Sequence, residues 1–198
     1  GMRVVVGLPD ALRADAARLY WQAFGGKLGR VLGPDDRALA FLADSMTAEH
    51  ALAALDDDGR LLGLIGFRAG AVGFAGGSYA ALVRCYGRAG ALWRGTALWA
   101  LTQGSADAAD HGRLLIDGLC VAADARGRGV GTALIEALVR SPAAEGYREL
   151  HLEVIDSNLR ARALYERLGF RAVRTARLGP LRHLFGFRAA VTMVRPLA

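Results

Sequence analysis

The residues whose types and spacing indicate chemistry most clearly form a glycine-rich turn. Gly127, Gly129 and Gly131 alternate with other residues there, and two arginines, Arg126 and Arg128, lie beside them. Closely spaced glycines let several backbone N–H groups point at one anion. The helix-like segment that follows would add about half a positive charge at its N-terminus. The pattern therefore predicts a turn that binds a pyrophosphate group.

Two other phosphate-binding motifs are incomplete in this turn. A Walker loop requires Gly-Lys-Ser or Gly-Lys-Thr, and the only lysine of the chain is Lys27. A dinucleotide-binding fingerprint requires Gly-x-Gly-x-x-Gly, and Thr132 stands where its last glycine should be. An acidic residue does follow about 20 positions later, at Glu149 or Glu153. The remaining alternative is a glycine-rich turn that binds no ligand.

A second motif lies C-terminal to the turn, within residues 152–170. The strand-like sequence Leu-Glu-Val-Ile-Asp-Ser-Asn ends at Asn158, and a helix-like sequence closes with Leu-Tyr-Glu-Arg-Leu-Gly-Phe. Together with the pattern Arg-x-x-Gly-x-Gly at Arg126, Gly129 and Gly131, this motif resembles the signatures of the GCN5-related N-acetyltransferases. The resemblance covers about residues 113–170. It implies an enzyme that moves an acetyl group from acetyl-CoA to a primary amine.

The resemblance also implies how the substrates are held. Transfer would occur by direct attack in a ternary complex, with a small molecule or peptide that the sequence does not identify as the acceptor. The backbone of residues 119–121 would pair with the pantetheine arm as an additional strand does. The resemblance also implies that the two parallel strands, 113–121 and 148–155, splay apart to leave a cleft for it. The residues expected to contact acetyl-CoA are Leu119, Cys120, Val121, Arg126, Gly127, Arg128, Gly129, Val130, Gly131, Thr132 and Asn158.

Acetyl transfer requires that the amine lose a proton and that the leaving thiolate gain one. The resemblance makes Tyr165 the general acid, whereas by itself it would be a packing tyrosine. Glu153 and Asp117 are the candidate bases, and Glu153 ranks first because it belongs to the second motif. Strand alternation predicts that Asp117 shares a face with Leu115, Leu119 and Val121, where burial would raise the pKa of its carboxyl. The alternative is a bulge or turn that takes Asp117 to solvent.

Several of these residues have simpler explanations that stay open. Cys120 is expected to be an inert buried thiol, because direct transfer needs no acyl-enzyme. Asn158 also fits the N-cap of a helix. His151 and His183 are weaker candidates for the base than the two carboxylates. The histidines are scattered along the chain and no Cys-x-x-Cys sequence occurs, so no metal site is predicted.

Composition excludes several classes of protein. The chain has 198 residues, of which 53% are hydrophobic, and this fraction excludes an intrinsically disordered chain. The net charge of +6 favours an anionic partner, yet the absence of a long run of like charges makes nucleic acid an unlikely one.

The alternative to an enzyme is a non-catalytic module that binds CoA or nucleic acid with the same turn. A homodimer is left open.

No membrane anchor or signal peptide is predicted, and a cytoplasmic location is therefore expected. The most apolar long stretch, residues 61–83, carries Arg68 and six glycines, which argues against a transmembrane helix.

The hydrophobic periodicity predicts one domain over residues 1–198 with a mixed α/β sheet of about seven strands and helices on both faces. Gly25-Gly26 is expected to end the first helix. An Ala-, Gly- and Trp-rich insertion at about 69–110 is expected to form one or two helices beside the acceptor site. The predicted strands are 3–6, 48–55, 60–67, 113–121, 148–155, 170–177 and 189–195, and the other predicted helices are 9–24, a short one from residue 34, 129–140 and 158–168.

Overall fold

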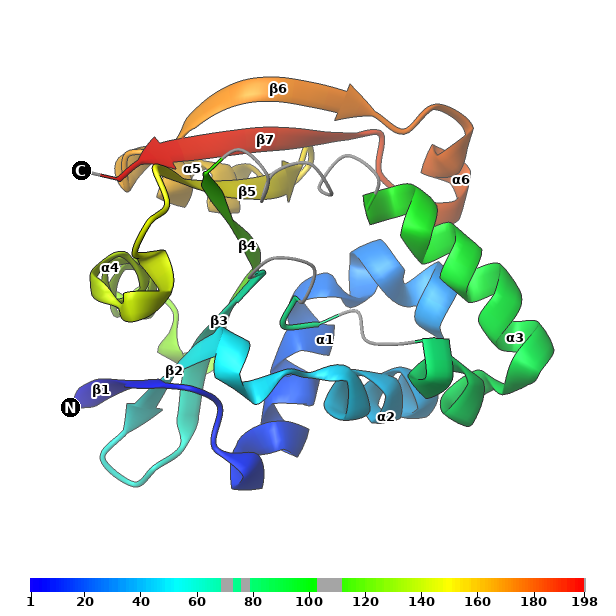
Figure 1. Cartoon of the computed structure of the whole chain (residues 1–198), viewed down its shortest axis with the longest axis horizontal. Coiled ribbons are helices and arrows are strands. Elements are labelled where there is room, and N and C mark those ends of the chain that lie inside the picture. Colours follow the sequence, from blue (N-terminus) through cyan, green and yellow to red (C-terminus); the bar gives the residue numbers. More distant parts are fainter. Residues whose placement is uncertain (69–72, 76–78, 103–111, 198) are drawn as a thin grey trace.

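A computed structural model describes residues 1–68, 73–75, 79–102 and 112–197 (Figure 1). Seven strands form one sheet in the order β1-β2-β3-β4-β5-β7-β6. All neighbouring strands are antiparallel except β4 and β5, which are parallel. The predicted seven-stranded mixed sheet is confirmed. The strands are β1 (Met2–Val6), β2 (Ala51–Asp56), β3 (Leu61–Arg68), β4 (Arg113–Val121), β5 (Glu149–Ile155), β6 (Arg171–Arg177) and β7 (Ala189–Pro196).

Helices cover both faces of the sheet, as predicted (Figure 1). On one face, α4 (Val130–Arg140) packs mainly against β2 and β3, and α5 (Leu159–Arg167) belongs to the same core cluster, which also includes β4 and β5. The other face is covered by α1 (Arg13–Leu32), α2 (Asp35–Ser45), α3 (Tyr79–Thr102) and the short α6 (Arg182–Phe185). We call these the α4 face and the α1 face.

The first helix is longer than the sequence predicts. Gly25-Gly26 does not end α1, which continues to Leu32. A glycine inside a helix costs about 1 kcal/mol relative to alanine, and burial of an apolar turn can exceed that. Here Val31 and Leu32, at 0% and 1% exposed, pack into a core cluster with α3 and α6. Tertiary packing therefore overrides the local signal.

The insertion contributes α3, which confirms the predicted helical character. Gly87, with φ 74° and ψ 173°, interrupts the helical geometry, so α3 consists of two helical segments that meet at this residue. The parts of the insertion at 69–72, 76–78 and 103–111 lie outside the described residues.

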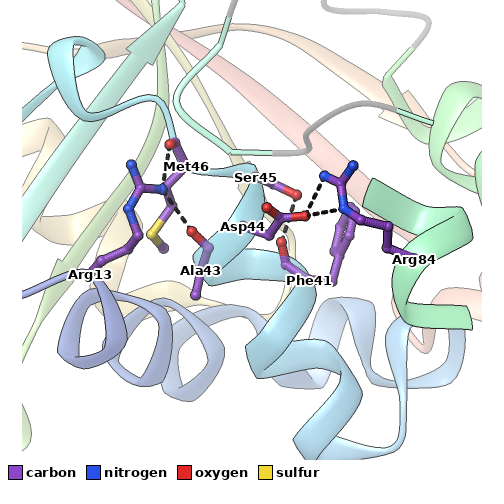
Figure 2. A network of polar contacts seen from close by, with 7 residues as sticks. All are labelled: Arg13, Phe41, Ala43, Asp44, Ser45, Met46 and Arg84. Atoms are coloured by element: carbon purple, nitrogen blue, oxygen red, sulfur yellow. Dashed lines mark hydrogen bonds and ion pairs between the residues drawn. The ribbon is translucent and has the colours of Figure 1, made fainter. Parts of the chain in front are cut away.

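Polar contacts join the three long helices of the α1 face (Figure 2). The guanidinium of Arg13 on α1 donates to the carbonyl oxygens of Ala43 and Met46, both at 2.7 Å, and so caps the C-terminal end of α2. The carboxylate of Asp44 on α2 pairs at 2.6 Å with Arg84 on α3. These contacts fix α2 and α3 relative to α1, which itself lies on β4.

Candidate active site

The strands β4 and β5 part in the middle of the sheet. They pair only over three positions, of which Leu115 opposite His151 is the last. Beyond this pair, β4 continues to Val121 and β5 to Ile155 without pairing to each other. The β5-side edge of residues 116–121 therefore carries backbone groups that an extended ligand could pair with. We call this opening the fork.

Only two of the three strand residues predicted to hold the cofactor present their backbone to the fork. The N–H of Ala122 donates to the carbonyl of Leu62 on β3 at 2.8 Å. A Cβ on Gly63 would lie 2.8 Å from the Cys120 carbonyl oxygen, so this carbonyl also faces β3. Backbone groups alternate sides along an antiparallel strand, and those of Leu119 and Val121 therefore point into the fork.

The thiol of Cys120 lies in the core under α1, where its residue is 1% exposed. Burial raises the pKa of this thiol well above its ordinary value. The group therefore stays protonated at neutral pH, which agrees with the expected inert thiol and gives it no part as a nucleophile.

The glycine-rich turn follows directly after β4 and is exposed. Gly127 and Gly129 have φ values of 76° and 79°, a conformation that only glycine adopts without strain. Nothing lies within 4 Å of the position that a Cβ would take at either residue. Gly129 is the N-cap of α4, so the free N–H groups of the first helical turn, which starts at Val130, border this open space.

Side chains around the turn make it positive. Arg126, Arg128 and Thr132 are exposed beside the glycines. The one carboxylate nearby, Asp124, is ion-paired with Arg60 on the neighbouring hairpin, and this contact lowers the pKa of Asp124. Because the negative charge of Asp124 is balanced by Arg60, the exposed arginines and the helix N-terminus can attract a phosphate group.

Gly131 differs from the other two glycines, because it is buried. A Cβ there would lie 3.4 Å from Leu164 of α5 and 3.6 Å from Leu119 of β4. These are ordinary van der Waals distances, so Gly131 packs in the core between α5 and β4. The other two glycines shape the turn.

Tyr165 and Asn158 lie on the α4 face of the sheet. Tyr165 is 9% exposed, belongs to the same core cluster as Val154, and packs edge-on against Phe170 with the ring centroids 5.8 Å apart. Burial raises the pKa of its phenol, so the proton that a general acid needs is retained. Asn158 is the N-cap of α5, with its side-chain oxygen accepting from the N–H of Ala161 at 3.1 Å.

Asp117 is the extra residue of a β-bulge, the alternative left open by the sequence, and the prediction that it shares a face with Leu119 and Val121 is wrong. The pairing moves from Gly66–Gly118 directly to Phe67–Ile116, so Asp117 has no partner on β3. One extra residue reverses the side-chain alternation. Leu119 and Val121 consequently pack against the core of the α4 face, and Asp117 lies on the α1 face.

The carboxylate of Asp117 already has protein partners. Its Oδ2 accepts from the N–H of Phe74 at 2.7 Å, and the N–H of Ala75 also donates to it. Burial raises the pKa of Asp117, while the Arg68 guanidinium and these two N–H groups oppose the rise. Asp117 therefore holds the segment at residues 73–75 in place, whether or not it also acts as the base.

Glu153 lies on the α1 face as well. On β5, Leu150, Leu152 and Val154 face α4 and α5 as predicted, so the alternating positions His151 and Glu153 face the other way. Glu153 is partly buried and stands two residues beyond the last β4–β5 pair. Asp117 stands two residues beyond the same pair on β4. The two carboxylates therefore flank the fork on one face, and Tyr165 lies on the other.

Two further residues of this region, Tyr20 and Phe24, are not among the predicted site residues, and His151 was predicted only as a weaker candidate for the base. Tyr20 and Phe24 of α1, with ring centroids 4.6 Å apart, cover Gly118 beside the bulge. A glycine inside a strand indicates such a close approach, and this was the available signal. His151 is 3% exposed, and both of its ring nitrogens lack a hydrogen-bond partner. Only the position of the fork distinguishes it from an ordinary core histidine.

The aromatic residues of the insertion lie in different places, since Phe74 is buried beside Asp117 and the two tryptophans are on α3. The inner side of α3 packs with Ile155 of β5 in one core cluster, which brings α3 to the α1 face near Glu153. Trp93 and Trp99, at 44% and 64% exposed, lie on its outer side. Within the described ranges, no group of three or more His, Cys, Asp or Glu residues could hold a metal ion, and no described helix has the length and apolarity to cross a membrane.

Solved structures of acetyltransferases share this fold. A GCN5-related N-acetyltransferase from Kribbella flavida is 22% identical over 99% of this chain and 98% of its own, with a TM-score of 0.59. The ribosomal-protein-S18-alanine N-acetyltransferase from Escherichia coli is 16% identical over 100% and 95%, with a TM-score of 0.57. Nourseothricin acetyltransferase is 23% identical over 75% of this chain, which spans 65% of that protein, with a TM-score of 0.50.

No curated protein matches the chain significantly. The family model of the acetyltransferase (GNAT) family, however, matches residues 14–170. This range includes α1, the fork, the glycine-rich turn and α5, and thus every element described above as part of the site. The chain belongs to the acetyltransferase (GNAT) family and is an acetyl-CoA-dependent N-acetyltransferase.

Proposed function

We propose that residues 1–198 form one acetyltransferase domain that transfers acetyl directly from acetyl-CoA to a primary amine in a ternary complex. The observation that carries this proposal is the continuity between the glycine-rich turn and the fork. A pyrophosphate on the N–H groups before Val130 leaves the pantetheine arm next to Val121 and Leu119, whose backbones point into the fork. The acetyl end then reaches the fork near the bulge at Asp117.

The sheet separates the two proton transfers. During attack, a bond forms between the amine nitrogen and the acetyl carbon, and the bond from that carbon to sulfur breaks. Tyr165, on the α4 face, donates its phenolic proton to the departing thiolate. The amine arrives from the α1 face, where Glu153 and Asp117 flank the fork, and loses its proton there.

Between the two carboxylates, we propose Glu153 as the base. The carboxylate of Asp117 accepts the backbone N–H groups of Phe74 and Ala75 and is held toward that segment. Glu153 belongs to the second motif, which resembles the family's signature. An amine that arrives already neutral would need neither group.

The acceptor is proposed only as a primary amine of a small molecule or a peptide. The names of the similar structures include both kinds of acceptor, nourseothricin and an alanine of ribosomal protein S18. Tyr20 and Phe24 lie beside the bulge on the α1 face, which supports an acceptor that enters next to these rings.

The test is amine-dependent release of free CoA from acetyl-CoA, with peptides, polyamines, aminoglycosides and amino acids as acceptors. Acetyl-CoA alone should stabilise the protein by about 2.7 kcal/mol at 100 times its dissociation constant. Gly129→Glu should abolish this stabilisation, because its carboxylate would occupy the open space of the turn. Gly146→Glu is the matched control, since Gly146 also has a positive φ, 84°, and open space around it.

The outcomes separate the alternatives. Thermal stabilisation without CoA release for any amine would support a non-catalytic CoA-binding module. Nucleic-acid binding whose logarithm falls linearly with the logarithm of salt concentration would support the nucleic-acid-binding alternative. Full stabilisation of the Gly129→Glu variant by acetyl-CoA would refute the proposed cofactor site.

A further inference from the structure

His151 is a buried polar residue that the mechanism above does not use. Its imidazole is 3% exposed, and neither Nδ1 nor Nε2 has a hydrogen-bond partner. Leaving a buried polar group without a partner costs about 1–3 kcal/mol, so such a group in a native structure indicates a bound water or a functional role. Apolar residues of similar size would pack at this position without that cost.

The place of His151 in the sheet favours a functional role. His151 and Leu115 form the last pair before β4 and β5 part, so the imidazole lies at the inner end of the fork. Its side chain is on the α1 face, as are those of Glu153 and Asp117. Residues two apart on a strand lie on the same face, with their Cα atoms about 7 Å apart. Glu153 and His151 are therefore neighbours on this face, and a bridging water can connect two polar side chains that do not touch.

The charged groups that face His151 come from three strands. On its own strand these are Glu149 and Glu153, and on β4 they are Arg113, which pairs with Glu149 at 2.5 Å, and Asp117. From β6, Arg174 acts on it electrostatically. The strand β7 places the uncharged Val194 directly opposite. Arg195 of β7 is paired instead with Glu136 of α4 at 2.7 Å, on the other face.

We propose that His151 is the inner end of the path by which the acceptor amine loses its proton. The proton passes from the amine nitrogen to the carboxylate of Glu153, and then through a bridging water to a ring nitrogen of His151. The carboxylate is thereby restored, and the imidazolium releases the proton to solvent after the acetylated product leaves. His151 touches neither substrate and is a positioning residue. This inference rests on the proposed function.

The electrostatics are suited to this role. Burial lowers the pKa of His151, and Arg113 and Arg174 lower it further, so the ring is neutral at neutral pH and able to accept a proton. The carboxylate of Glu149 opposes this lowering and stabilises the imidazolium while it exists.

The first experiment measures the ionisation of His151 directly, by NMR titration of the histidine ring nitrogens in the full chain. We expect a midpoint below 6.5 in the wild type. Glu153→Gln removes a negative charge from the path, and should lower the pKa of His151 further by at least a few tenths. Glu145→Gln, at an exposed position after α4, is the control and should leave it unchanged. Equal midpoints in the wild type and Glu153→Gln would overturn the proposal.

The second experiment measures the pH dependence of kcat/KM for His151→Gln. Loss of the imidazole should reduce kcat about tenfold or more at neutral pH, leave the KM for acetyl-CoA unchanged, and move the acidic limb of the profile. His183→Gln, on the exposed side of α6, should change none of these. If the His151→Gln enzyme were active and the acidic limb of its kcat/KM profile were the same as that of the wild type, the proposed proton path would be refuted. If the wild type released no CoA in the presence of amines, the proposed function would be refuted instead. The NMR titration would still test whether the charge of Glu153 affects the pKa of His151.

If His151→Gln fails to fold, the NMR titration of the wild type and Glu153→Gln decides the question without it.

Discussion

Gly118 offers the sharpest test of how α1 is held against the reacting strand. A Cβ added at this residue would lie 2.9 Å from Cε2 of Phe24 and 3.1 Å from Cε2 of Tyr20. Neither ring can yield easily, because the two pack on each other with centroids 4.6 Å apart and Tyr20 is only 8% exposed. Overpacking of this kind costs about 1–3 kcal/mol.

Gly118→Ala should therefore lower the melting temperature by about 2–12 °C, given about 2–4 °C per kcal/mol for a chain of this size. Because α1 must move off the bulge at Asp117, the KM for the acceptor amine should rise while the affinity for acetyl-CoA changes little. Differential scanning calorimetry gives the first quantity. Steady-state kinetics and calorimetric titration with acetyl-CoA give the other two.

Gly29→Ala is the matched control, since it makes the same substitution in α1 itself. Gly29 is helical, and nothing lies within 4 Å of its added Cβ. Replacing it should stabilise the protein by up to about 1 kcal/mol through helix propensity alone. Opposite signs for the two variants are the expected result. A Gly118→Ala protein as stable as the wild type would show that α1 does not press on β4 as described.

Four other predictions follow from the site. Tyr165→Phe should lower kcat about 10²–10⁴-fold in stopped-flow assays and leave acetyl-CoA binding nearly intact, because only the proton donor is lost. Glu153→Gln should flatten or displace the acidic limb of the kcat/KM profile, whereas Asp117→Asn should leave that limb in place; the reverse pattern would make Asp117 the base. Asn158→Ala removes the N-cap of α5 and should reduce the free energy of unfolding by about 1 kcal/mol in urea titrations. Trp99→Ala should leave both KM values unchanged, because its ring is 64% exposed on the outer side of α3; a raised acceptor KM would contradict this.

The glycine-rich turn shows what local sequence determines. Its conformation depends on φ values near +76° to +79°, which glycine alone adopts without strain. Gly127 and Gly129 therefore predict the turn without any information on tertiary structure. The alternation of Leu150, Leu152 and Val154 likewise predicts which face of β5 is buried, because the side-chain period of a strand is two. The seven strands and the order of elements follow from the same local periodicities.

The length of α1 and the face of Asp117 could not be predicted in this way. Gly25-Gly26 has the composition of a helix end, yet the packing of Val31 and Leu32 against distant helices extends α1 beyond it. The bulge at Asp117 depends on how β3 pairs with β4. Gly118 inside β4 indicates that a bulge is possible there. The register itself depends on β3, and strict alternation therefore places Asp117 on the same face as Leu119 and Val121, which is wrong.

The family resemblance implies that the two parallel strands splay apart, but the point at which their pairing stops was decided only by tertiary structure. The motifs indicate that residues 113–121 and 149–155 are strands, but not that their pairing stops at Leu115 and His151. That limit determines which backbone groups remain for a ligand, which carboxylates face each other across the opening, and why a buried histidine lies at its inner end. The sequence determined the chemistry-bearing residues and their elements, because these depend on local backbone preferences. Their grouping on opposite faces of one opening arose from strand pairing between distant segments.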